Sequence, residues 1–170
     1  PVAYLEKCGL LDNEVIAAHC VHLSDEDIRI LAKCKRLTVV HNPNSNLKLA
    51  SGYCFRYQEL KEAGINVALG TDGCCSSNNL DMTEAMKQAS LLQKAWRFDP
   101  AIVPAREALD WATLNGAKAT ALDAGVLQVG KLADIALIDL KHYTMVPLHN
   151  AVSNLVYSAH GDAVKHLICD

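Results

Sequence analysis

Aromatic side chains are scarce in this sequence of 170 residues, where they make up 5 % of the total. Aliphatic side chains must therefore fill the core, and hydrophobic residues of all kinds reach 51 %. No apolar run is long enough to cross a bilayer, and the first residues do not have the pattern of a signal peptide. Length and composition predict a globular, cytoplasmic protein with the core of one ordinary domain.

An excess of positive charge is also absent. The sequence has 16 Lys and Arg against 19 Asp and Glu, which gives a formal net charge of −3. A protein that binds nucleic acid or an anionic membrane surface usually carries the opposite balance. The charge therefore argues against both kinds of partner.

Two common metal-binding patterns, Cys-x-x-Cys and His-x-His, are missing as well. The seven cysteines are an odd number, and the adjacent pair Cys74-Cys75 lacks the spacing of a zinc site. We expect the other five to be small, reduced core residues of an intracellular protein. These five are Cys8, Cys20, Cys34, Cys54 and Cys169.

The sequence begins at Pro1 rather than Met, within a predicted helix, and ends at Asp170 within a predicted strand. Both ends lack the stop signals that usually bound such elements. We therefore expect this chain to be a segment of a longer protein.

The most informative stretch is residues 67–79, VALGTDGCCSSNN. It predicts a short apolar strand that breaks at Gly70, presents Asp72, and leads to a helix from Leu80 that Asn78 or Asn79 caps. Asp72 is a candidate metal ligand or proton acceptor, although Asp also commonly holds a turn through its own backbone. A phosphate-binding loop is disfavoured because the Lys and Ser/Thr of a P-loop are absent.

Upstream, the pattern alternates between strands and helices. Buried strands are predicted at 14–18, 37–40 and 65–69, with helices after each, including one that Ser24 and Asp27 begin as a capping box. This alternation predicts a parallel sheet covered on both faces. The three strands deliver His19, His41 and Asp72 to one sheet edge, where α/β folds bind ligands.

The side chains at this edge have more than one interpretation. His19 could be a core histidine, a proton shuttle or a metal ligand. We expect His22 to be structural and His41 to be structural or to contact substrate. The segment 42–52 is predicted to be a long polar loop, and its Ser45 and Asn46, with residues 76–79, could bind a polar ligand or hydrogen-bond turns.

The second half predicts a helix over 104–114, a break at Asn115-Gly116 and a short helix over 117–122. Strands follow at 135–138 and 164–169, with a helix over 152–158 between them. These late strands do not alternate with long helices. We therefore expect a boundary near residue 122, with a small β domain over 123–170.

Four motifs in this order resemble the amidohydrolase superfamily, in its branch of methylthioadenosine/S-adenosylhomocysteine deaminases and triazine hydrolases. The motifs are AAHCVHL at 17–23, HNPNSNLKLASG at 41–52, LGTDG at 69–73 and GKLAD at 130–134. The resemblance covers essentially the whole chain. It implies an α/β fold in which residues 1–122 are the last part of a TIM-type (β/α)8 barrel. Residues 123–170 would be the C-terminal part of a flanking β-sandwich, with a final helix packed on the barrel.

The resemblance also implies a site and a chemistry. Asp72 matches the family's metal-binding Asp after the eighth strand, and His19 matches the catalytic His after the sixth. The family's His-x-His pair, its fifth-strand His and its Glu have no counterpart in these residues. The implied cofactor is a divalent metal, zinc or iron, in the complete protein. The implied reaction is attack of metal-activated water on the amino-bearing ring carbon of a purine nucleoside-type small molecule, with Asn46, Ser76 and Asn78 near the substrate.

Other functional interpretations of the sequence stay open at this point. A triazine aminohydrolase or chlorohydrolase shares this scaffold, a fragment without most metal ligands could be catalytically silent, and the 70–73 loop could serve a small-molecule binding module. A barrel that is cut open exposes strand edges and apolar surface. We therefore expect a homo-oligomer or association with the missing half-barrel.

Overall fold

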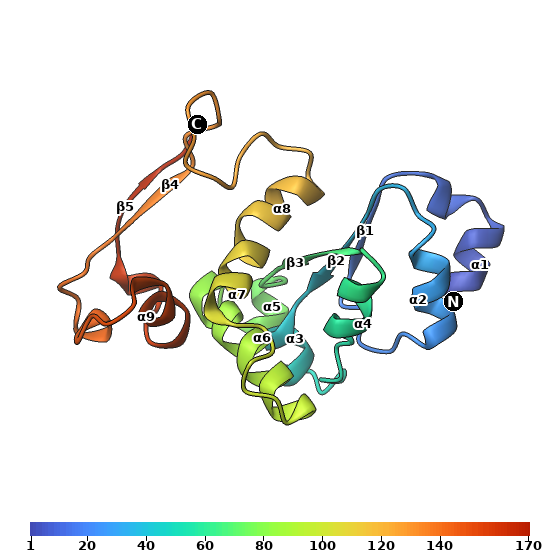
Figure 1. The fold of residues 1–170 in the computed structure, drawn as a ribbon, viewed down its shortest axis with the longest axis horizontal. Coiled ribbons are helices and arrows are strands. Elements are labelled where there is room, and N and C mark those ends of the chain that lie inside the picture. Colours follow the sequence, from blue (N-terminus) through green and yellow to red (C-terminus); the bar gives the residue numbers. More distant parts are fainter.

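Two separate sheets organise the chain, and the computed structural model describes all residues from 1 to 170 (Figure 1). A three-stranded sheet lies within the first 70 residues, and a two-stranded ribbon lies near the C-terminus. The elements in chain order are α1 Val2–Lys7, η1 Leu10–Asp12, β1 Val15–Ala18, α2 Asp25–Leu31, β2 Leu37–His41, α3 Pro43–Lys48, α4 Tyr57–Glu62, β3 Asn66–Leu69, α5 Cys74–Ser77, α6 Met82–Arg97, α7 Ala105–Ala112, α8 Leu114–Ala119, β4 Ile135–Ile138, η2 Tyr143–Met145, α9 Ala151–Tyr157, η3 Gly161–Ala163 and β5 Val164–Ile168.

The first sheet is parallel in the order β1-β2-β3, with Ala17 opposite Val39 and Val39 opposite Val67. This confirms the predicted α/β class and the positions of the first three strands. The helices between the strands start where local chemistry allows. Ser24 and Asp27 form the predicted capping box of α2, in which each side chain accepts a backbone N–H of the other residue.

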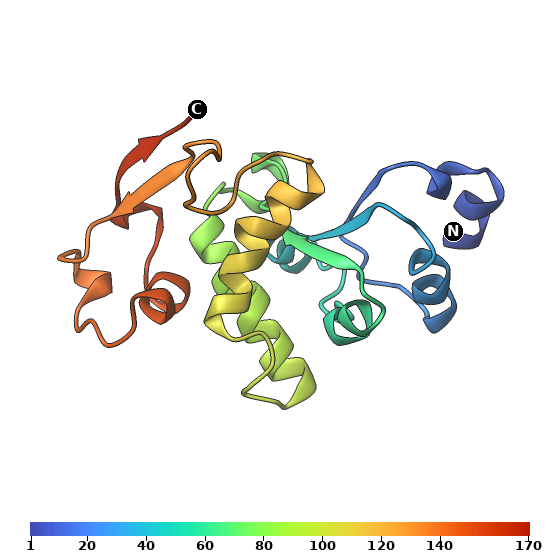
Figure 2. The same cartoon turned by 45° about the horizontal axis from the view of Figure 1, so that its top comes forward.

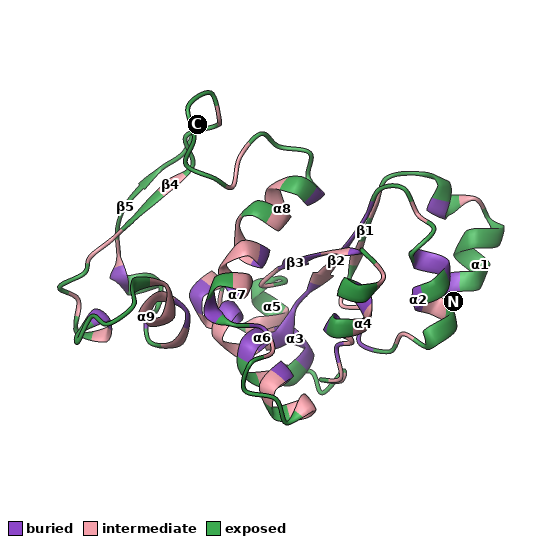
Figure 3. Ribbon diagram, viewed as in Figure 1, coloured by how far each residue is buried: buried purple, intermediate pink, exposed green.

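One face of this sheet packs against helices and forms the main core. Val39 and Val67 lie on that face with Phe55, Leu60 and Trp111, all of them buried, and Figure 3 shows this buried centre between exposed ends. The prediction that all three strands are buried is wrong for β1. Alternate residues of β1 are exposed, and Ile16 keeps 52 % of its surface accessible, because β1 is the edge strand and nothing covers its other face.

The segment 42–52 is not the predicted irregular loop. It contains the helix α3, which begins with Pro43 at its first turn. Asn, Ser and Pro usually indicate a turn, but Pro is also favoured in the first helical turn, where its missing N–H is not needed. Pro43, Ser45 and Asn46 are buried, so this short helix is part of the packed structure.

The predicted cap of the long helix is also wrong. Asp81 begins α6, and its Oδ1 accepts from the N–H groups of Thr83 and Glu84. Asn78 instead ends a short helix, α5, that the sequence did not predict, and it does so in the left-handed conformation with φ of 67°. Asn tolerates that conformation better than most residues. Asn78 therefore caps the C-terminus of α5 instead of the N-terminus of α6.

The break in the 104–122 region falls at Thr113 rather than at Asn115-Gly116, because Thr113 has the non-helical dihedrals −126° and −88°. Asn115 lies inside α8 and donates from Nδ2 to the backbone oxygen of Val67, at 2.8 Å. That bond holds α8 against β3, an edge strand of the sheet.

The predicted core position of the five cysteines is confirmed only in part, since Cys20 and Cys34 pack against the main core. All seven are free thiols, yet Cys8 and Cys169 are exposed and Cys20, Cys34 and Cys54 are half-buried. Cys8 ends a short helix near the N-terminus and Cys169 follows the exposed strand β5. Apolar neighbours in sequence do not guarantee burial at the ends of a chain.

The C-terminal elements form a second, smaller cluster. The antiparallel β4–β5 ribbon projects from the rest of the chain in both views (Figures 1 and 2), and its strands are largely exposed. The helix α9 connects it to the main core through buried Val156 and through the hydroxyl of Tyr157, 2.9 Å from Ser90 Oγ. Asp81 Oδ2 adds a bond from the backbone N–H of Gly161. No helix is both long and apolar enough for a membrane span.

Two phenylalanines offer a matched test of this core. Phe55 is fully buried and Phe98 is 94 % exposed. We expect Phe55→Ala to lower the free energy of unfolding by about 3–5 kcal/mol, because it removes a large buried ring and leaves a cavity. Phe98→Ala should change it by less than about 0.5 kcal/mol. Urea unfolding of both variants measures the difference, and equal effects would contradict this description of the core.

Candidate functional site

His19 and Asp72 meet at the carboxyl edge of the parallel sheet. His19 follows β1, Asp72 follows β3, and β2 lies between these strands. The side chains nevertheless approach across the end of β2, with His19 Nε2 3.9 Å from Asp72 Oδ2. They keep 41 % and 31 % of their side-chain surface accessible, so a ligand can reach both. The structure thus brings together the two residues that the sequence predicted as a pair.

The backbone turns sharply where these side chains project. His19, Cys20 and Asp72 all have positive φ, at 68°, 52° and 59°. Non-glycine residues are uncommon in this left-handed region, and such conformations gather at functional sites because the surrounding structure must hold them in place. Three of the eight non-glycine residues with positive φ thus lie at this sheet edge, next to the paired side chains.

Two adjacent residues of α3 hydrogen-bond to His19 and Asp72. Asn46 Oδ1 lies 2.8 Å from His19 Nδ1, and Ser45 Oγ donates to Asp72 Oδ2 at 2.7 Å. Both α3 side chains are buried, at 1 % exposure for Ser45 and 2 % for Asn46. The sequence suggested Ser45 and Asn46 as ligand or turn groups. It gave no signal that they would contact His19 and Asp72, since that depends on the unpredicted helix.

Hydrogen bonds keep Asp72 ionised. The bond from Ser45 is the main reason that the pKa of Asp72 is below its ordinary value, and the backbone N–H of Gly73, 2.9 Å from Oδ1, adds to the effect. His19 and the Ser76 side chain lower the pKa further. A carboxylate that stays ionised in this way is suited to binding a cation.

His41, the last residue of β2, is buried and is not part of the His19–Asp72 pair. Its ring is 1 % exposed and stacks on Phe55, with centroids 4.0 Å apart. Neither ring nitrogen has a hydrogen-bond partner in the chain. Burial, with a smaller contribution from His19, lowers the pKa of His41 to about 3. Of the two roles predicted for His41, the structural one fits this position.

Other predicted residues lie around the pair. Ser76 is in α5 beside Asp72, and Asn78 is exposed at the end of that helix. His22, predicted to be structural, places Nε2 2.6 Å from the backbone oxygen of Ser51. Gly70 is required here, since a Cβ at that position would collide with Oδ1 of buried Asn42.

The residues present fit part of a metal centre. Imidazole and carboxylate are suitable ligands, but a catalytic site usually has at least three protein ligands. The chain contains no group of three or more His, Cys, Asp or Glu side chains placed to hold a metal ion. A metal bound by Asp72 at this edge would therefore need ligands beyond those in this chain.

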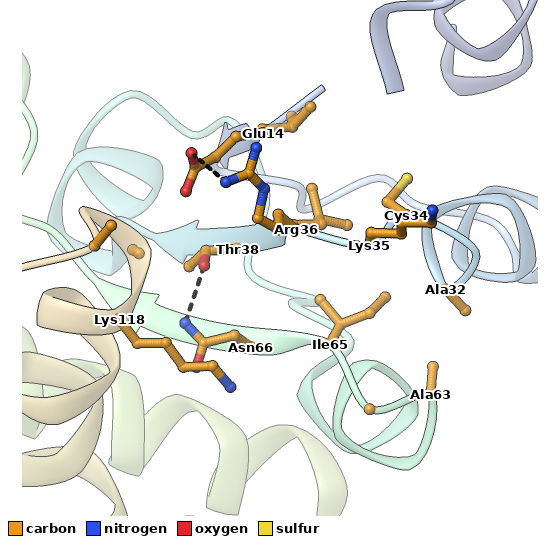
Figure 4. A pocket seen from close by; sticks show the side chains of 15 residues that line it. Glu14, Ala32, Cys34, Lys35, Arg36, Thr38, Ala63, Ile65, Asn66 and Lys118 are labelled. Atoms are coloured by element: carbon orange, nitrogen blue, oxygen red, sulfur yellow. Dashed lines mark hydrogen bonds and ion pairs between the residues drawn. The ribbon is translucent and has the colours of Figure 1, made fainter. Parts of the chain in front are cut away.

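A hollow of about 340 Å³ opens at the opposite, amino-terminal edge of the sheet (Figure 4). Arg36 pairs there with Glu14, and Asn66 donates to Thr38. Lys35 and Lys118 also line it. It does not include His19 or Asp72, and in parallel α/β folds this edge contributes to stability rather than to catalysis.

Known proteins are similar to this chain over its whole length. The model of the amidohydrolase family matches residues 1–170. A 5'-deoxyadenosine deaminase of Methanospirillum hungatei is 52 % identical over 99 % of this chain and 37 % of its own length. A 5-methylthioadenosine/S-adenosylhomocysteine deaminase of Thermococcus sibiricus is 49 % identical over all of this chain and 40 % of its own length. The chain thus spans about two fifths of these curated relatives.

Solved structures show the same similarity. A zinc-bound adenosine deaminase from Xanthomonas campestris has a TM-score of 0.92 and 39 % identity over 99 % of this chain and 38 % of its own. The atrazine chlorohydrolase of Arthrobacter aurescens in complex with zinc has a TM-score of 0.89 and 28 % identity over the same shares. The match over every residue, together with the paired His19 and Asp72, shows that the chain belongs to the amidohydrolase family.

Proposed function

We propose that the protein containing this chain is a hydrolase that deaminates a purine nucleoside, such as 5'-deoxyadenosine, methylthioadenosine or S-adenosylhomocysteine. The observation that carries the proposal is the approach of His19 Nε2 to Asp72 Oδ2, at 3.9 Å, on an accessible sheet edge. The names of the relatives that are about half identical support the nucleoside substrate.

In this proposal Asp72 accepts the proton of the attacking water. The hydrogen bonds from Ser45 and the Gly73 N–H orient its carboxylate for that purpose. His19 assists the attacking water through a hydrogen bond. Oxygen then bonds to the ring carbon that carries the amino group, the C–N bond breaks, and the proton taken up by Asp72 leaves with the amine as ammonia. Ser76 and Asn78 would contact the nucleoside from α5, whereas buried Asn46 has its Oδ1 at His19, so its predicted substrate contact stays a prediction.

A divalent metal, zinc or iron, would supply a bound water whose pKa is lowered towards neutrality. Asp72 would be this chain's ligand for it, and His19 would lie beside it. Since the chain supplies too few ligands of its own, the proposal requires further ligands from outside these 170 residues.

The fold proposal follows the same reasoning. Residues 1–122 would form the last strands and helices of a (β/α)8 barrel, and residues 123–170 part of a flanking β-sandwich with α9 packed on the barrel. The free edges of β1 and β3 support this division, because further strands can pair there. The exposed face of β1 is turned away from the helices and would line the barrel interior, and the β4–β5 ribbon is also mostly exposed. The same open surfaces support association with another copy or with the rest of the barrel.

Triazine hydrolysis is the second candidate, supported by structures with TM-scores near 0.89. Their identity of 28–29 % is lower than that of the nucleoside deaminases, so we favour the nucleoside. A catalytically silent fragment and a small-molecule binding module remain as alternatives.

The test measures ammonia release by the 170-residue chain and by the whole polypeptide that its gene encodes, each with added zinc or iron. The substrates are 5'-deoxyadenosine, methylthioadenosine, S-adenosylhomocysteine and atrazine. We expect the whole polypeptide to deaminate at least one nucleoside and to be inactive on atrazine. Chloride or amine release from atrazine alone would favour the triazine candidate. A folded, metal-loaded protein that is inactive on all three nucleosides would overturn the proposal.

A further inference from the structure

We propose that Asn46 is a positioning residue that fixes the tautomer of His19, so that Nδ1 carries the proton and Nε2 presents a lone pair towards Asp72. The inference deepens the proposed function. Its test, however, measures the imidazole itself and needs no turnover.

The contact that supports it is short and buried. Asn46 Oδ1 lies 2.8 Å from His19 Nδ1, and Asn46 is 2 % exposed. An amide oxygen can only accept a hydrogen bond, so Nδ1 must be the donor. A neutral imidazole carries one ring proton, and Nε2 is then left unprotonated.

The consequence appears on the other side of the ring. Nε2 faces Asp72 Oδ2 at 3.9 Å, too far for a direct hydrogen bond. An unprotonated nitrogen and a carboxylate are both acceptors. Together they favour a donor between them, such as a water molecule or a hydroxyl group, rather than each other. The opposite tautomer would turn Nε2–H towards Asp72 and compete with that donor.

The helix that carries Asn46 is well placed to hold it still. The backbone N–H of Asn46 donates to the backbone oxygen of Asn42, and the backbone oxygen of Asn46 accepts from the N–H of Ser51. Two residues on, Lys48 Nζ donates to the backbone oxygen of Cys75 at 3.0 Å, which connects α3 to α5. The neighbouring Ser45 holds Asp72, so one helical turn sets both members of the pair.

The presence of Asn at position 46 is explained by a requirement for function rather than for stability. Nδ2 of Asn46 is buried and has no hydrogen-bond partner. An unpaired buried amide group is unfavourable, and Leu would fill a similar volume without that cost. The residue is therefore better explained by its oxygen, which meets His19, than by its contribution to packing.

The experiment records long-range ¹H–¹⁵N NMR spectra of the ¹⁵N-labelled 170-residue chain at a pH where its imidazoles are neutral. His19 is assigned among the seven histidines by the signals that disappear in His19→Gln. We expect the protonated nitrogen of His19 to be Nδ1. Asn46→Asp, which offers only acceptor oxygens, should keep this tautomer. Asn46→Leu, which offers none, should shift the proton to Nε2.

The two Asn46 variants control for each other, since a merely structural role would not make the tautomer follow the acceptor. Backbone amide spectra establish that each variant is folded. If Asn46→Leu does not fold, the wild-type tautomer still decides. An Nε2–H tautomer in the wild-type chain would overturn the proposal, because the amide nitrogen of Asn46 would then face His19. An unchanged Nδ1–H tautomer in folded Asn46→Leu would overturn it as well. Neither result depends on whether the whole protein deaminates nucleosides.

Discussion

Asp72→Asn is expected to reduce turnover of the whole protein by about 10²–10⁴-fold, which is the usual contribution of a positioned acid or base. Asn has nearly the same shape as Asp, and its oxygen can still accept from Ser45 Oγ. It cannot take up a proton at neutral pH, and it is a poorer ligand for a divalent cation. The loss should therefore appear in kcat and in bound metal.

The measurements are steady-state ammonia release on 5'-deoxyadenosine and elemental analysis of the purified variant. Asp72 is partly exposed, and Asn can still accept from Ser45, so the variant should remain folded and unfold cooperatively. Asp123→Asn is the matched control, since Asp123 is exposed and contacts Lys131 away from the site. Full turnover in Asp72→Asn would show that Asp72 is not the proton acceptor.

The sequence predicted the parts of this site that depend on local pattern. The apolar runs before His19 and Asp72 identify two parallel strands, and parallel strands bring their carboxyl ends to one edge. The capping box at Ser24 and Asp27 was also readable, because its two bonds join residues only three apart. The motifs were specific enough to indicate the family.

The remaining parts depend on tertiary contacts. The sequence Asn42-Pro43-Asn44-Ser45 has the composition of a turn, yet α3 forms because Pro43, Ser45 and Asn46 are buried against the site. The support that Ser45 gives Asp72 joins residues 27 apart, which local pattern cannot indicate. The predicted cap of α6 is wrong because Asn78, Asn79 and Asp81 are all residue types that favour cap positions. Only the path of the backbone in the folded chain places Asp81 at the start of α6.

Burial was the least predictable property. His41 is the last residue of β2 and lies at 1 % exposure against Phe55, while the side chain of His19, one residue beyond β1, is 41 % accessible. Alternation along a strand sends neighbouring side chains to opposite faces, so His41 shares the helix-covered face with Val39. His19 differs because it lies beyond the end of β1 with a φ of 68°, which takes it out of that alternation. The same sheet edge therefore holds one histidine that a ligand can reach and one that it cannot.

His41 should make the chain sensitive to mild acid. Its pKa is about 3 in the folded chain and about 6.5 when unfolded. Between these values the unfolded state binds one more proton than the folded state, so stability falls as the pH falls. We expect a loss of roughly 1.5–2 kcal/mol in the free energy of unfolding between about pH 6.5 and 5 from this residue.

His41→Phe isolates that contribution, because Phe keeps an aromatic ring against Phe55 and does not titrate. Urea unfolding across this pH range should give a dependence on pH that is shallower by one proton than in the wild type. His160→Phe is the control, since His160 is exposed and should leave the slope unchanged. The carboxyl groups with lowered pKa, among them Asp72 and Asp81, lose their contribution only at lower pH, so they do not obscure the comparison. Equal slopes in wild type and His41→Phe would mean that the ring of His41 takes up a proton within the folded chain, and a charged imidazole would then lie directly beneath His19.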